Sequence, residues 1–429
     1  MTKYRSVFFL LLLMTFATVF SVQGQEKNSL TILLESCFEN NPELKAAFHR
    51  WQAADSAIIH KTAIPDPVVN FRHNTEPIQT RIGAQKQVLT VSQMLPYPGK
   101  QKTAIRLNHL LADNDRFLYE AKFRDLMVEV KKSYAEVWFL QRAIKLAEAN
   151  NGLLEFMLKE TVANLSSPTL APVLRAQSQL AQSANDIINY SELLEAEKAR
   201  MRALTHREEL PPEWFVEIPV LQIPEQNNDL LQQTLQNRIE IKSAENARNI
   251  SVTKLKLANF DNKPDFTLGY SRSYTGNRPD LNNVYLKGEG KDAIGFFVQL
   301  NLPVWENKNR SRIGEAREKK SEANAMFKAK EDETRANFFK LWFNLANRKR
   351  LNQLYIQTIL PQAERAVESA QSVFQADNAK YSDYLETVAT VYAIRIAAWR
   401  AEADCFISAC ELEKWTGTPF SLQNREKQQ

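Results

Sequence analysis

Two stretches in the second half of the chain alternate between large apolar residues and small or polar ones. In Ala293 to Pro303 the parity that begins at Ile294 is apolar throughout, and the other parity is small or polar except at Phe297. Asp265 to Tyr274 repeats this pattern. A period of two predicts strands, and about ten residues is the length that a tilted strand needs to cross a bilayer. Taken alone, the two strands also fit a soluble sheet with a core on one side.

The first half of the chain contains a matching pair of shorter patterns. Val68 to Thr75 and Gln87 to Leu95 each alternate in polarity, and we predict a tight connection between them through Glu76-Pro77 to Gly83. The Pro-Tyr-Pro-Gly run at 96–99 then ends the second strand. The chain therefore supplies four predicted strands in two pairs, 67–96 and 264–303.

Helical patterns surround these strands. Thr31 to Lys61 is amphipathic and is interrupted by Asn40-Asn41-Pro42. From Lys100 to about Asn164 the helical pattern is continuous for roughly 65 residues, which at 1.5 Å per residue gives a length of about 100 Å. Helices of this length occur in coiled coils and helical arrays. After a turn at 166–168, Leu170 to about Leu204 returns as a second helix.

The order of helix, strand pair, long helix and returning helix occurs twice. Pro264 in the second half is equivalent to Pro67 in the first, and Trp342-Phe343 is equivalent to Trp138-Phe139. Each pair of positions is separated by roughly 200 residues, the scale of a whole domain. The helix lengths predict that in each half two short helices stack end to end beside the long one. The predicted divisions are a signal peptide (1–24), a first repeat (25–210), a linker (211–228), a second repeat (229–417) and a C-terminal tail (418–429).

Four strands with a lipid-type face cannot form a closed structure on their own. An open sheet edge in hydrocarbon leaves backbone groups unpaired, at a cost of several kcal/mol each. Two copies of the chain would close a small barrel filled by side chains, and three copies would give twelve strands and room for a pore. The predicted fold is therefore mainly α with a small β part, in which long antiparallel helices extend a barrel shared between copies.

The beginning of the chain indicates secretion. Met1 to Gly24 resembles a secretory signal, with Lys3 and Arg5 before an apolar run from Val7 to Phe20. The alternative is an uncleaved membrane anchor.

The remaining composition argues against an enzyme, a metal protein or a nucleic-acid-binding protein. The formal net charge of +5 is too small a bias for nucleic acid. Three cysteines do not make a disulfide framework, and the five histidines show no ligand spacing. Pro98-Gly99-Lys100 lacks the first glycine and the Ser or Thr of a phosphate loop, so we interpret it as a helix start. We predict no catalytic residue, no metal site and no cofactor.

Several short motifs, in order along the chain, resemble those of the TolC-like outer-membrane efflux proteins. They are Asn41-Pro42-Glu43-Leu44, the turn from Leu95 to Lys100, Leu360-Pro361-Gln362-Ala363, Asp383-Tyr384-Leu385-Glu386 and Trp415-Thr416-Gly417. With the two-fold repeat, the resemblance covers nearly the whole chain after the leader. It implies a homotrimer with a 12-stranded barrel in the outer-membrane lipid and a long helical tunnel in the periplasm. It also implies docking to a periplasmic adaptor, or membrane fusion protein, and to an inner-membrane pump.

The same resemblance implies a pore constriction at the end of the rod far from the barrel. Asp383 and Glu386 lie three apart at the start of the last helix, on one face, and match the positions whose carboxylates ring the constriction in the family. Three copies would place six carboxylates around the axis, attracting cations. The alternative is that Asp383 stabilises the first-turn amides and the helix dipole, with Glu386 solvated beside it. The turns predicted to line the mouth and contact the adaptor contain Ser166, Ser167 and Pro168 in the first repeat and Asn378, Ala379 and Lys380 in the second.

These predictions together describe a passive exit duct of a tripartite efflux or export system. One alternative is a periplasmic coiled-coil adaptor without a pore, although the symmetric strand pairs do not fit it. Another is a soluble helical scaffold. The residues leave open whether the cargo is metal ions, drugs or proteins, which pump is the partner, and which contacts close the mouth.

Overall fold

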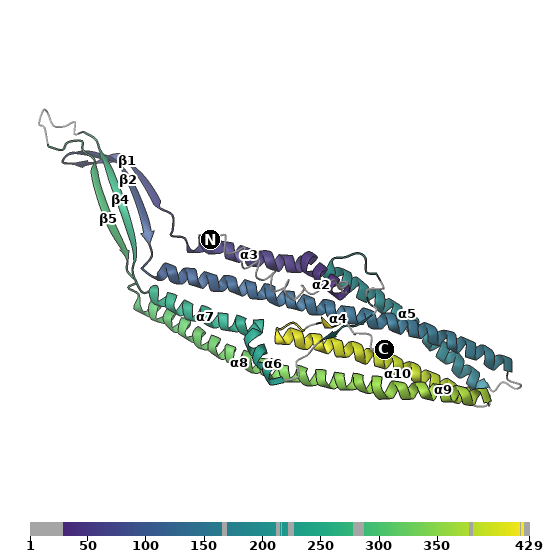
Figure 1. Ribbon diagram of the computed structural model, residues 1–429. Helices are drawn as coiled ribbons and strands as arrows, with labels where there is room; N and C mark the ends of the chain where they lie inside the picture. The colour runs from purple at the N-terminus through teal and green to yellow at the C-terminus, as the bar shows by residue number, and fades with distance from the viewer. Residues whose placement is uncertain are drawn as a thin grey trace.

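The computed structural model describes residues 29–164, 170–211, 215, 217–221, 227–277, 287–376, 381–420 and 422–423. Figure 1 shows a sheet at one end of a long rod of helices. The first repeat contains α2 (Ser29–Asn40), α3 (Pro42–Thr62), β1 (Val68–Thr80), β2 (Gly83–Leu95), α4 (Lys100–Asn164) and α5 (Leu170–Thr205). The second contains α6 (Asn227–Asn237), α7 (Ile239–Phe260), β4 (Asp265–Thr275), β5 (Ala293–Asn301), α8 (Glu306–Leu354), η2 (Tyr355–Ile359), α9 (Leu360–Ala376) and α10 (Tyr381–Thr416). The short strands β3 (Val220–Leu221) and β6 (Leu422–Gln423) pair with each other.

The four long strands form one antiparallel sheet in the order β1–β2–β4–β5, so the two predicted pairs join. The connection between β1 and β2 is tight, as predicted, but the predicted bounds from Glu76 to Gly83 are wrong, because β1 continues to Thr80 and β2 begins at Gly83. The ladder shifts between His73 and Ile78, and this irregularity accommodates Pro77, which has no N–H to pair. Proline is tolerated here because β1 is an edge strand.

The predicted long helices are confirmed. In the first repeat α4 spans 65 residues, and α3 and α5 both pack along it. In the second repeat α8 and α9 continue each other, and α7 and α10 pack against them (Figure 1). A π-helical turn at Tyr355–Ile359 separates α8 from α9. Such a turn is expected just before Pro361, because proline cannot donate the next helical hydrogen bond.

The junction between the two short helices is built differently in the two repeats. In the first, the Asn41 side chain accepts a hydrogen bond from the Leu44 N–H at 3.0 Å, and Pro42 occupies the first helical turn. This is a side-chain cap of the kind that stabilises a helix start. In the second repeat Arg238 takes that place without capping the helix. Its guanidinium instead lies 3.2 Å from the centre of the Trp415 ring.

The main hydrophobic core lies at mid-height of the rod, where both repeats meet. Trp138, Tyr134, Phe215 and Phe338 are fully or almost fully buried there. A second, smaller cluster near the far end of the rod joins α4, α5, α9 and α10. The two cores hold helices of the first repeat against helices of the second over much of the rod.

A buried ion pair crosses the main core. The Lys131 ammonium on α4 donates to both carboxylate oxygens of Glu413 on α10, each at 2.6 Å. Burial raises the pKa of Glu413 above its ordinary value, and Lys131 opposes that rise. The pair therefore connects the two repeats at a place where either charge alone would be costly.

Two predictions concern parts of the chain outside the described residues. The signal peptide at 1–24 is one, and most of the C-terminal tail at 418–429 is the other. None of the helices that the structure describes is both long enough and apolar enough to cross a membrane.

Candidate functional site

One face of the sheet is apolar and open to the surroundings. On β5, Ile294, Phe296 and Val298 are exposed to 61%, 85% and 64%. The register places the apolar residues of the other strands on the same face, because directly paired residues of antiparallel strands point the same way. They are Val69, Phe71, Leu89, Val91, Leu95, Phe266, Leu268 and Tyr270. The same face also holds Gln93 in the middle of β2 and Arg272 toward the loop end, so it is mainly and not wholly apolar. An exposed, mainly apolar face of this size is expected to contact lipid.

The opposite face of the sheet carries mainly small or polar side chains. It has few charges, with Arg72 near the loop end and Asp265 near the helices. Phe297 is the aromatic exception that the sequence shows, and it lies on this face beside Gly269. The other residues of this face are Val68, Asn70, Val88, Thr90, Ser92, Met94, Thr267, Ser271, Ser273, Ala293, Gly295 and Gln299.

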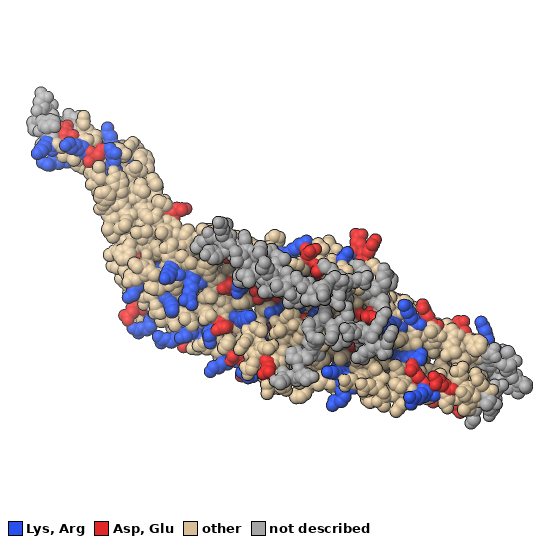
Figure 2. All heavy atoms as spheres, in the orientation of Figure 1, with Lys and Arg blue, Asp and Glu red and all other residues tan. Residues whose placement is uncertain are grey.

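The distribution of charge agrees with this assignment. Figure 2 shows charged side chains at the loop end of the sheet and along the helices, with an almost uncharged band between them. At about 3.3 Å per residue, the nine residues of β5 span roughly 30 Å, the thickness of a hydrocarbon core.

The strands β1 and β5 leave two open edges. A lipid-facing sheet with open edges requires pairing with further copies.

The sheet is joined to the rod by a polar contact at the start of α4. Asp265 accepts hydrogen bonds from the Tyr97 N–H and from the Lys100 ammonium, both at 2.9 Å. Lys100 also pairs with Asp261 at 3.2 Å. Burial alone would lower the pKa of Lys100, but the two carboxylates raise it above its ordinary value. Lys100 therefore lies at a helix start after a strand, as predicted, and its role here is to bind β4.

At the far end of the rod, α10 presents the two predicted carboxylates. Asp383 and Glu386 are both exposed, on the side of α10 away from the buried Tyr384 and Leu385. Neither carboxylate forms an ion pair with any residue that the structure describes. The carbonyl oxygens of the same two residues accept hydrogen bonds from Thr387 and Thr390. The pair can therefore face an axis or solvent, and both interpretations of its role stay predictions.

The residues predicted to form the mouth turns lie outside the described residues. Ser166, Ser167 and Pro168 fall in 165–169, and Asn378, Ala379 and Lys380 fall in 377–380. The helices on either side of these turns are described and end side by side at the tip of the rod (Figure 1).

Two contacts connect α5 of the first repeat to α10 of the second near this end. The Arg175 guanidinium donates to the Ser382 hydroxyl at 3.0 Å. The Tyr392 hydroxyl donates to the Asp186 carboxylate at 3.2 Å. Burial and the nearby Asp186 charge raise the pKa of Tyr392, so this hydroxyl keeps the proton that it donates. Both contacts join residues that are distant in sequence, and both come from the structure alone.

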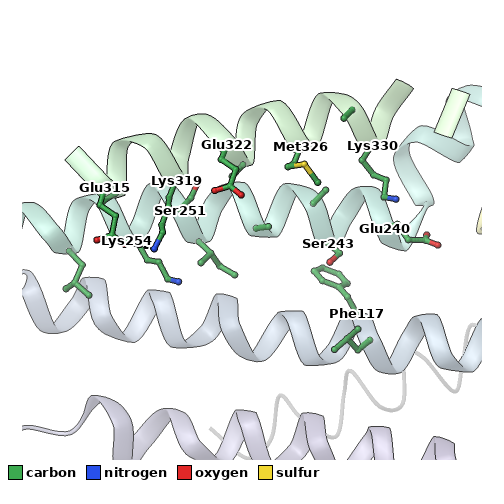
Figure 3. Close-up of a pocket in the computed structure, with 18 of the residues that line it drawn as sticks. Phe117, Glu240, Ser243, Ser251, Lys254, Glu315, Lys319, Glu322, Met326 and Lys330 are labelled. Atoms are coloured by element: carbon green, nitrogen blue, oxygen red, sulfur yellow. Dashed lines mark hydrogen bonds and ion pairs between the residues drawn. The ribbon is translucent and has the colours of Figure 1, made fainter. Parts of the chain in front are cut away.

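A groove of about 820 Å³ lies along α7, between α4 and α8 (Figure 3). Its wall combines alanines with side chains of both charges, including Lys254, Lys319 and Glu322. Lys319 is already paired with Glu315 on its own helix at 2.5 Å. A wall of paired, mixed charge selects no particular ligand. No group of three or more potential metal ligands occurs in the part of the chain that the structure describes.

Comparison with known proteins shows which proteins this chain is similar to. Residues 230–418, the second repeat, match the family model of the outer membrane efflux protein. Several solved structures of outer-membrane channels share the fold over more than nine tenths of this chain. The predicted resemblance to TolC-like outer-membrane efflux proteins is therefore confirmed, as is the predicted fold.

Individual relatives are distant in sequence. The cobalt-zinc-cadmium resistance protein CzcC of Cupriavidus metallidurans is 22% identical over 387 residues, covering 88% of this chain and 87% of the relative. The outer membrane protein VceC of Vibrio cholerae superposes with a TM-score of 0.72 at 18% identity, covering 91% of this chain and 97% of VceC. The open state of the MtrE channel of Neisseria gonorrhoeae gives 0.72 at 16% identity, covering 94% and 91%.

These matches bear on the remaining predictions. The outer-membrane location and the efflux-channel function are confirmed at the level of the family that the match names, and the alternative of a pore-free adaptor finds no support. The matching family model describes outer membrane efflux proteins, and the similar solved structures include outer-membrane channels. Structural relatives form channels, which fits the need of this sheet for further copies.

Proposed function

We propose that three copies of this chain form a passive exit duct that crosses the outer membrane and the periplasm. The observation that carries the proposal is the four-stranded sheet with one exposed apolar face, one polar face and two open edges. Joining β5 of one copy to β1 of the next removes every edge, and three copies give twelve strands with a water-filled interior. The helices continue the ring below the sheet as a tunnel.

The far end of the rod is proposed to dock a periplasmic adaptor, which connects the duct to an inner-membrane pump. Phe156 on α4 is exposed to 61% close to this end. Because α4 is flanked by α5 and α10 of its own chain, a neighbouring copy in the ring does not cover it. Exposed apolar side chains on such a helix fit the apolar stripe of a partner helix.

Asp383 and Glu386 are proposed to form the acidic constriction of this duct. Their exposure without a partner among the described residues supports the assignment. Six carboxylates around a narrow axis concentrate cations and exclude anions. CzcC is named for resistance to cobalt, zinc and cadmium, and an acidic mouth is compatible with cationic cargo in this chain also.

Replacing both residues, as Asp383→Ala with Glu386→Ala, is expected to lower the cation-to-anion permeability ratio by roughly an order of magnitude. The reversal potential in a salt gradient across a planar bilayer measures this ratio. The matched control is Glu192→Ala with Glu195→Ala, which removes two carboxylates from α5 far from the mouth. An unchanged ratio in the Asp383 and Glu386 variant would contradict the constriction, whereas failure of the unmodified protein to conduct would contradict the duct itself.

A further inference from the structure

We infer that Phe297, with Val68 and Met94, forms an apolar contact site on the pore-facing wall of the barrel. The site fits solutes that carry aromatic or alkyl groups, and organic cations of this kind above all. The inference rests on the proposed duct, because the face that carries Phe297 borders water only when other copies close the ring. The four-stranded sheet determines the position of the site within that wall.

The register places Val68, Ser92, Gly269 and Phe297 in one row across all four strands. Met94 lies in the adjacent row of the same face. Val68 and Met94 remain exposed to 62% and 39%. The three apolar side chains therefore lie on one diagonal band, oblique to the barrel axis because barrel strands are tilted, of a wall that is otherwise made mainly of small and polar groups.

Gly269 fixes the orientation of the aromatic ring. A Cβ atom at Gly269 would lie 2.1 Å from the nearest carbon of the Phe297 ring, and within 2.7 Å of two others. The ring therefore covers the glycine, in the space that any other side chain would occupy. A ring lying on the wall leaves the passage open and presents its other face to the interior. An aromatic side chain covering a glycine across strands is a known means of stabilising a sheet, and this would be the purely structural role.

The chemistry of the wall favours an additional role in contacting cargo. The face of an aromatic ring is electron-rich and attracts cations, most strongly when they are weakly hydrated. Three copies would place three such rings around one level of the barrel, with Val68 of one copy near the seam that β5 of the next copy forms. A solute with both positive charge and apolar groups would gain from the ring and from the aliphatic side chains together. Small, strongly hydrated ions would pass without delay.

The test uses tetraphenylphosphonium as the probe and tetramethylammonium as the small cation for comparison, on single channels of the full-length mature protein in planar bilayers. Transient block by tetraphenylphosphonium is expected in the unmodified channel. Phe297→Ser is expected to shorten the mean block by roughly fivefold, and Phe297→Tyr, which keeps the ring, is expected to retain it. The matched control is Phe296→Ser, which removes the neighbouring ring on the lipid face.

The possible outcomes distinguish a failure of the proposed contact site from a failure of the proposed exit duct. The contact site is supported if the mean tetraphenylphosphonium block is shorter in Phe297→Ser but not in Phe296→Ser. The potassium conductance and the response to tetramethylammonium should then be unchanged. Equal block in Phe297→Ser and the unmodified channel would overturn it while leaving the duct intact. If Phe297→Ser does not form channels, a shortened block in Phe297→Leu, which keeps apolar volume without the ring, is the supporting result and an unchanged block the overturning one. Absence of conductance in the unmodified protein would instead contradict the proposed function.

Discussion

Replacing Lys131 with methionine is expected to destabilise the folded protein by about 3–5 kcal/mol, the usual cost of removing one partner from a buried ion pair. The substitution leaves the Glu413 carboxylate buried at mid-height without its cation. Heat or urea unfolding in detergent measures the loss of stability. The matched control is Lys132→Met, which breaks a more exposed pair with Glu411 at 2.8 Å and is expected to cost no more than about 1 kcal/mol.

The destabilisation in Lys131→Met is also expected to depend on pH. Burial raises the pKa of Glu413 above its ordinary value of 4.5, and without Lys131 the rise is larger. An acid whose pKa is higher in the folded chain than in the unfolded chain favours folding most below the unfolded pKa, and this contribution is lost as pH rises through the folded pKa. The variant should therefore be closest to the unmodified protein near pH 4 and furthest from it at neutral pH. A destabilisation that is the same at both pH values would contradict the buried-charge explanation.

Breaking the two hydrogen bonds between α5 and α10 is expected to open the mouth of the duct. Arg175→Ala removes the donor to Ser382, and Asp186→Ala removes the acceptor for Tyr392. A hydrogen bond to a charged group contributes about 1.5–3 kcal/mol, so removing either bond should raise the population of the open state about tenfold or more. Single-channel conductance and open probability of the double variant measure the effect.

An ion pair between α9 and α10 supplies the control for this experiment. Arg395 on α10 donates to Glu364 on α9 at 2.9 Å, and Arg395→Ala leaves both hydrogen bonds to α5 in place. It should leave the conductance unchanged. Equal conductance in the Arg175 and Asp186 double variant and the unmodified channel would show that these hydrogen bonds do not hold the mouth closed.

Local pattern was sufficient to predict the large elements of the fold. Alternating polarity identified β4 and β5, and an unbroken helical pattern identified α4 over the same 65 residues that the structure assigns to it. These signals are strong because each element has one face in lipid or in a core along its whole length. The extension of β1 past Pro77 was missed because proline normally ends a strand, and the irregularity that tolerates it depends on the partner strand.

The finer features of the site depend on contacts between distant parts of the chain. Phe297 breaks the polarity pattern in sequence, and its explanation lies in Gly269 on the neighbouring strand. Tyr392 and Asp186 are separated by 206 residues, as are Arg175 and Ser382 by 207. No local spacing signals such pairs. By contrast, Asp383 and Glu386 lie three residues apart on one helix, so their shared face follows from simple helical spacing, and both are exposed in the structure.

Several copies of this chain are proposed to close one water-filled pore through their shared sheets. Reconstitution of the purified full-length mature chain into planar bilayers, after light scattering has measured its oligomeric state, tests this proposal most directly. We predict a trimer that gives discrete, stable conductance steps and prefers cations to anions. Insertion without conductance steps, or a protein that remains monomeric and does not enter the bilayer, would contradict the proposal.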